Sequence, residues 1–120
     1  MTRGTRANDI AALAEGAARA RRAESTASPD AMAARRAACD GLGPVVARYI
    51  EARTGDRERL SAEQLDRLDA ACNDWLAVYA RRLGRECDPG VPVRTAAEAV
   101  IDTHDVVAAA ELLTGVDADW

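Results

Sequence analysis

Residues 61–84 read SAEQLDRLDAACNDWLAVYARRLG and contain the clearest helix signal in the chain. Ser61 and Gln64 have the spacing of a capping box, in which each side chain accepts a hydrogen bond from the backbone N–H of the other residue. The large apolar residues that follow recur three and four positions apart, so they share one face of a helix. They are Leu65, Leu68, Cys72, Trp75, Leu76, Tyr79 and Leu83. Because Gly84 can take the left-handed conformation that ends a helix, we expect a central helix over 62–83.

A second strong helix signal lies near the C-terminus. Thr95 and Glu98 form another capping box, and Gly115 follows the last apolar residues, which predicts one helix over 96–114. The two helices are separated by residues 85–93, where a Pro-Gly turn and a further proline disfavour helix. We therefore expect an extended linker whose valines, Val91 and Val93, pack against the rest of the protein.

The N-terminal half gives looser signals. Serine, proline and aspartate at 28–30 form a typical helix start, and the Gly-Leu-Gly-Pro sequence at 41–44 predicts a break. Segment 1–25 has high helix propensity but few large apolar residues, so we expect its helix to dock loosely. The expected helices are 7–24, 29–40, 44–54, 62–83 and 96–114.

Composition agrees with an all-α fold. Apolar residues make up 48% of the 120 residues, and much of that share is alanine, the best helix former. Strand-type alternation is not found in the sequence, and the length is typical of one domain. We expect residues 1–120 to form a single domain of about five helices in a compact, antiparallel-leaning bundle.

Lysine is absent and all 16 basic residues are arginine. Schiff-base enzymes and P-loop nucleotidases need a lysine at the reacting centre, so both classes are excluded. Three cysteines and no secretory or membrane-spanning segment predict free thiols in the cytoplasm, with no membrane contact. No cofactor motif is found, so no cofactor is expected.

One set of residues has the composition of a zinc site. Three cysteines and a single histidine are the ligands of a Cys3His centre. They are Cys39, Cys72, Cys87 and His104. Zinc sites usually take two ligands from one short knuckle, and no such pair occurs here, so the spacing argues against a metal.

Two polar residues lie on the inner face of the expected 96–114 helix. His104 and Glu111 are two turns apart, and Tyr79 on the central helix could supply a hydroxyl to them. A core histidine with a hydrogen-bond partner is the ordinary explanation. A small-ligand or catalytic site around His104, Glu111 and Tyr79, with an acid and a base in the pair, is the functional alternative.

Charge is distributed unevenly along the chain. Residues 1–60 carry 11 arginines and 8 acids, whereas residues 61–120 carry 5 arginines and 12 acids. The arginines expected to take part in contacts are Arg19, Arg21, Arg22, Arg35 and Arg36. The acids expected to form a stripe on the last helix are Glu98, Asp102 and Asp105. These two sets can pair within one chain or between copies.

The sequence therefore favours a non-enzymatic interaction module, such as an adaptor, an inhibitor or an immunity-type protein. Its partner would be another protein or, in a homodimer, a second copy of the chain. The alternative is a helical small-molecule or metal-binding domain, enzymatic or not, centred on the three residues named above. Nucleic-acid binding is disfavoured by the net charge of -4 and by the few aromatic residues.

Overall fold

A computed structural model describes residues 2–23, 29–55 and 59–117 of the chain. Its central element is α4 (Ala62–Arg82), which confirms the strongest sequence prediction. The predicted capping box is present: the Ser61 hydroxyl accepts from the Gln64 N–H at 3.1 Å, and the Ser61 N–H donates to the Gln64 side chain at 2.9 Å. Leu68 and Leu76, on the predicted inner face, are fully buried.

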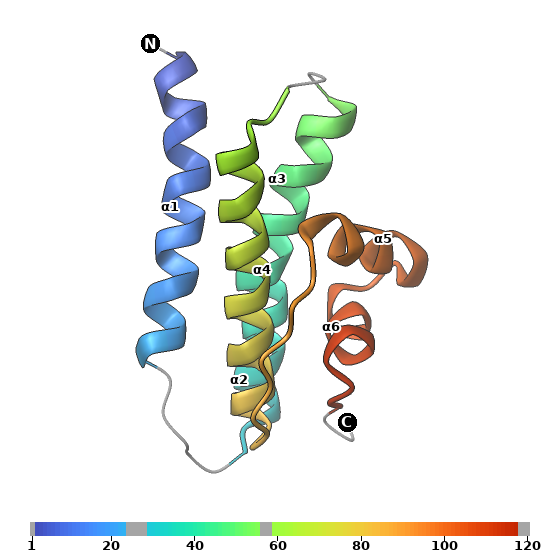
Figure 1. The fold of residues 1–120 in the computed structure, drawn as a ribbon. Coiled ribbons are helices and arrows are strands. Elements are labelled where there is room, and N and C mark those ends of the chain that lie inside the picture. The colour runs from blue at the N-terminus through green and yellow to red at the C-terminus, as the bar shows by residue number, and fades with distance from the viewer. Residues whose placement is uncertain (1, 24–28, 56–58, 118–120) are drawn as a thin grey trace.

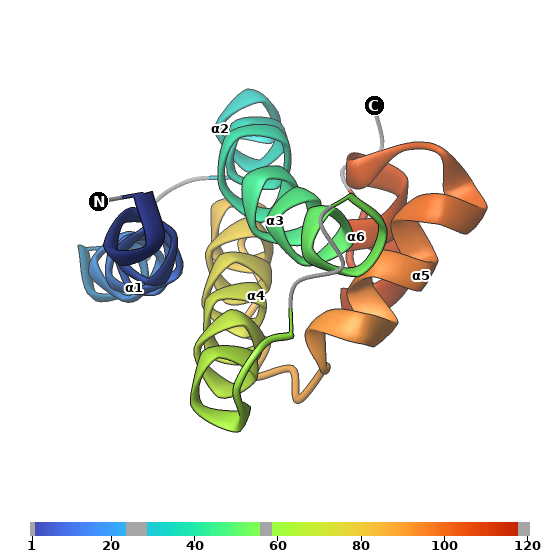
Figure 2. The same cartoon turned by 90° about the horizontal axis from the view of Figure 1, so that it is seen from above.

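The other helices surround α4, and the described residues contain no strand, so the fold is all-α. α1 (Thr2–Ala23) lies along one side of α4 (Figure 1). The chain then ascends through α2 (Ala31–Arg36), a π-helical segment η1 (Ala37–Leu42) and α3 (Gly43–Thr54), and it descends along α4. α5 (Val93–Thr103) and α6 (Val106–Thr114) pack together on the side away from α1 (Figure 2).

α1 is attached to the bundle by buried apolar residues and by ion pairs. Ile10 and Ala17 are fully buried. The Asp9 carboxylate lies 3.1 Å from Nε of Arg48, whose side chain is only 6% exposed. None of the described helices is long and apolar enough to cross a membrane.

The predicted break at residues 41–44 is wrong, because the helix continues through it. Residues 37–42 form a π turn, and Gly43 has helical backbone angles, φ -51° and ψ -54°. In an α-helix the Pro44 ring would clash with the carbonyl four residues earlier, and the wider π turn relieves this crowding. The helix also starts later than expected, with Asp30 as its cap, since the Asp30 side chain accepts from the Ala33 N–H at 3.1 Å. Ser28 lies outside the described residues.

The single helix predicted over 96–114 is also wrong, because two helices meet at a corner. α5 begins at Val93, directly after Pro92, so Thr95 lies inside the helix and is not its cap. His104 ends α5 in the left-handed conformation, with φ 57° and ψ 24°. The Asp105 side chain then accepts from the Val107 N–H at 2.9 Å and caps α6. An aspartate that bonds the backbone ahead of it favours a new helix start over helix continuation.

Candidate anion-binding site

The structure does not bring His104 to Tyr79, whereas Glu111 lies near enough to Tyr79 for its charge to act on that hydroxyl. The prediction that His104 faces inward is wrong, because it is exposed at the corner between α5 and α6. The Tyr79 side chain is fully buried, and its hydroxyl donates to the Val116 carbonyl at 3.0 Å. Burial, together with the charges of Glu111 and Asp117, raises the pKa of Tyr79 to about 12. Tyr79 therefore has a structural partner already.

The four candidate zinc ligands also lie apart. Cys39 and His104 are exposed, Cys87 is half-buried, and Cys72 is fully buried inside α4. Burial raises the pKa of the Cys72 thiol to about 12, and the nearby Asp69 charge adds to this effect. The described part of the chain has no group of three or more His, Cys, Asp or Glu side chains placed to hold a metal ion.

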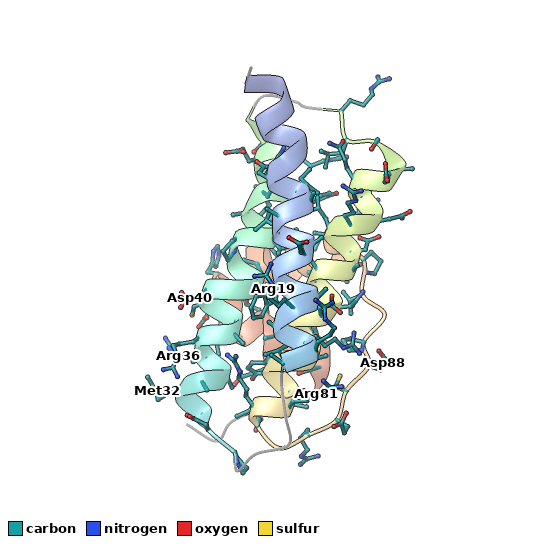
Figure 3. All side chains as sticks on the ribbon, turned by 90° about the vertical axis from the view of Figure 1, so that its left-hand side faces the viewer. Arg19, Met32, Arg36, Asp40, Arg81 and Asp88 are labelled. Carbon is teal, nitrogen blue, oxygen red and sulfur yellow. The ribbon has the colours of Figure 1, made fainter. Side chains whose placement is uncertain are left out.

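Among the arginines singled out from the sequence, Arg21 has the strongest contacts within the chain. It donates to Asp74 at 2.9 Å and to Asp88 at 3.0 Å, and these bonds raise its pKa. Arg21 thus joins α1 to α4 and to the linker that follows. Figure 3 shows Arg81 and Asp88 on one side of α1 and Arg36 on the other. Arg19 pairs at 3.5 Å with Glu15 in its own helix. The remaining arginines of this set are exposed: Arg22, Arg35 and Arg36.

The predicted acidic stripe is interrupted by the corner at His104. Glu98 lies in α5, where it pairs with Arg94 at 3.5 Å, and Asp102 is exposed near the end of the same helix. Asp105 belongs to the next helix as its cap. The three acids therefore do not form one surface along a single helix.

The structure instead reveals a cleft that sequence reasoning did not find. It has a volume of about 750 Å³ and lies between the end of α3, the segment that enters α4, and the start of α5. Figure 2 shows these three elements from above. The volume is within the range of small-molecule sites, about 300–1,000 Å³. Leu60, Leu65 and Pro92 contribute apolar surface to its lining.

Three arginines from three different elements line this cleft. Arg53 comes from α3, Arg59 from the segment before α4, and Arg94 from the first turn of α5. Within the described ranges, Arg53 and Arg59 have no ion pair or hydrogen bond, whereas Arg94 has its neighbour Glu98. Asp69 is the one carboxylate among the described residues of the lining. Among these residues the arginines therefore exceed the carboxylate by two charges, and Glu98 lies beside Arg94 outside the lining.

Asp69 and Asn73, one turn apart on α4, position the start of α5. The Asp69 carboxylate accepts from the Val93 N–H at 2.7 Å, and the Asn73 side chain accepts from the Val91 N–H at 2.8 Å. Pro92 has no N–H and provides no side-chain cap. The N–H groups of Arg94 and Thr95 are the two first-turn donors left without an intrahelical acceptor. The positive end of the α5 dipole is thus available at the cleft.

Tyr49 adds a hydroxyl to the same lining. The residue is 8% exposed and lines the cleft from α3. Its hydroxyl has no hydrogen-bond partner within the described part of the chain. This hydroxyl can therefore donate to a ligand atom in the cleft without first giving up a bond within the described residues.

The sequence contained one signal for this site that we did not use. Residues 53–59 read RTGDRER, a short segment with three arginines after a predicted helix. That segment indicates a basic surface, but it does not reveal that Arg94, more than thirty residues later, lies beside it. The α5 start depends on Pro92, which was interpreted as part of a linker.

The comparisons with known proteins place the chain in a family without identifying its activity. Neither the curated proteins nor the solved structures yield a match to it. The family model described as "Domain of unknown function (DUF8055)" matches residues 4–118, which is nearly the whole chain. The protein therefore belongs to the DUF8055 family.

Proposed function

We propose that this protein is a non-enzymatic binding module that holds an anionic group of its partner or ligand in the cleft between α3, α4 and α5. The observation that carries the proposal is the convergence of Arg53, Arg59 and Arg94 on one cleft. Asp69 and Glu98 offset part of the charge of these arginines, and a bound anion reduces the repulsion among them further. Guanidinium groups also offer paired N–H donors that match carboxylate and phosphate oxygens.

The lining favours binding over catalysis. Asp69 is the one carboxylate that the described part of the chain contributes to it, and that group already accepts the Val93 N–H at 2.7 Å. The remaining polar groups are hydrogen-bond donors: guanidiniums, backbone N–H groups and the Tyr49 hydroxyl. Donors of this kind hold and orient an anion without moving a proton.

The partner is a small molecule, another protein or a second copy of the chain, and a cytoplasmic setting fits the three free cysteines. A homodimer would have to place an acidic group of one copy in the cleft of the other. The exposed Asp102 and Asp117 are examples of such groups.

An NMR titration tests the proposal directly. We expect ¹H–¹⁵N spectra of the protein, recorded at constant ionic strength with a panel of phosphate, sulfate and carboxylate salts, to show saturable shifts at the Arg94 and Thr95 amides. Replacing both Arg53 and Arg59 by glutamine should abolish these shifts. The matched control replaces Arg35 and Arg36 by glutamine, which removes the same charge from an exposed surface outside the cleft lining.

Equal loss of the shifts in the two double variants would mean that binding follows net charge and not the cleft. Shifts that fail to saturate with every anion of the panel would also contradict the proposal. A dimer is tested separately by the dependence of the molecular mass on protein concentration in light scattering.

A further inference from the structure

We propose that the anionic group is a phosphate monoester joined to an apolar or aromatic body. This inference rests on the proposed function, because it identifies the ligand class for the same cleft. The charge of the lining carries the first step. Among the described residues of the lining, Arg53, Arg59 and Arg94 outweigh Asp69 by two charges, with Glu98 beside Arg94 outside the lining. A phosphate monoester has a charge of about -1.5 to -2 at neutral pH. A carboxylate or a phosphodiester has only one negative charge.

The donors of the cleft match a group with several terminal oxygens. The free N–H groups of Arg94 and Thr95 lie at the first turn of α5, an 11-residue helix. Helix N-termini with free N–H groups are recurrent phosphate sites. The unpaired guanidiniums of Arg53 and Arg59 and the hydroxyl of Tyr49 add donors from α3 and from the segment before α4. A monoester offers three terminal oxygens to these groups, whereas a carboxylate offers two.

The size and lining of the cleft call for more than an inorganic ion. A volume of about 750 Å³ far exceeds that of one phosphate group. The apolar lining from Leu60, Leu65 and Pro92 would stay in contact with water if only an ion were bound. An organic body beside the phosphate would cover this surface.

The test compares three ligands that share one aromatic body: phenyl phosphate, phenyl sulfate and methyl phenyl phosphate. Only phenyl phosphate becomes a dianion. We expect calorimetry at pH 7 to show that it binds at least about tenfold more tightly than the two monoanions. Its affinity should rise roughly tenfold between pH 5 and pH 7, because the second pKa of a phosphate ester is about 6. Binding of phenyl sulfate should stay nearly constant over the same range.

The sulfate also controls for titration of the protein itself. The charged and titratable groups that line the cleft are Tyr49 and Arg53 from α3, Arg59 before α4, Asp69 from α4 and Arg94 from α5. Glu98 faces the last of these. If one of these groups caused the pH dependence, phenyl sulfate would follow the same profile as phenyl phosphate, and the inference would be overturned.

Tyr49→Phe provides a variant that keeps the aromatic packing. We expect it to weaken phenyl phosphate binding about tenfold, the usual effect of losing a hydrogen bond to a charged group. Because the hydroxyl has no partner in the described protein, the urea midpoint should remain that of the unmodified protein. Unchanged affinity in Tyr49→Phe, with the fold intact, would contradict the role given to this hydroxyl.

The outcomes separate the two proposals. Equal affinity for phosphate and sulfate, with both lost in the Arg53/Arg59 double variant, would refute the monoester and leave the anionic cleft standing. Absence of binding by all three ligands would refute both. A phosphotyrosine peptide distinguishes the source: tighter binding than phenyl phosphate points to a phosphorylated protein, and equal binding points to a small phosphorylated molecule.

Discussion

Replacing Gly41 by alanine tests the packing of the π turn against α4. A Cβ atom at this position would lie 2.6 Å from Cε2 of Trp75 and still closer to two other atoms of the indole. Carbon atoms in contact are normally about 3.5–4.0 Å apart, so the ring would have to move by about 1 Å. Overpacking of this kind costs about 1–3 kcal/mol, whereas the better helix propensity of alanine returns up to about 1 kcal/mol. We expect a net loss of about 1–2 kcal/mol.

Gly16→Ala is the matched control for this substitution. Gly16 lies within α1, and a Cβ there would have nothing within 4 Å. The same change should therefore stabilise the protein by about 0.5–1 kcal/mol. Urea unfolding followed by circular dichroism at 222 nm measures both free energies. The two substitutions should thus change stability in opposite directions.

A double variant links the effect to the indole. Combining Gly41→Ala with Trp75→Leu provides space for the new methyl group, so the loss should be smaller than the sum of the two single losses. If Gly41→Ala stabilised the protein as Gly16→Ala does, or if the two losses simply added, the contact between the π turn and Trp75 would be refuted.

Three further perturbations follow from the described contacts. Tyr79→Phe removes the bond to the Val116 carbonyl and should lower the unfolding free energy by about 1 kcal/mol, measured in urea; no change would show that the bond contributes nothing. His104→Gly should raise the free energy of unfolding by about 1 kcal/mol, since glycine adopts the left-handed conformation of this position without strain. A loss of stability in this variant would contradict the helix corner. Stability should fall as pH rises from about 9 to 12, because the unfolded chain ionises its Cys72 thiol while the folded protein keeps it neutral. Cys72→Ala should reduce this fall, and an unchanged profile would exclude the thiol as its source.

The extent to which the fold could be predicted varied with the type of signal. α4 was predicted at both ends because its capping box and its apolar stripe are local features. The corner at His104 was missed because the alanines on both sides of it favour helix and the apolar spacing continues across it, and only Asp105 indicates a new start. At Pro44 the prediction took the proline as a break, whereas one π turn accommodates it within the helix.

The candidate site was harder to predict because it depends on tertiary contacts. Arg53 and Arg59 are close in sequence, and a basic segment was visible there. Arg94 joins them only because Asp69 bonds the Val93 N–H and so fixes where α5 begins. Residues such as His104 stood out by their type, but the decisive property was which arginines were left without partners.

The two hydrogen bonds from α4 to the linker bear on the thermodynamics of recognition. Asp69 and Asn73 hold the Val91 and Val93 amides before any ligand arrives, so the first turn of α5 is already ordered. A ligand of the proposed cleft would therefore meet a preorganised first turn, and its affinity would not be reduced by the conformational entropy of ordering that segment. Recognition on this side of the cleft then follows rigid-body association, and induced fit is confined to the long side chains of the arginines.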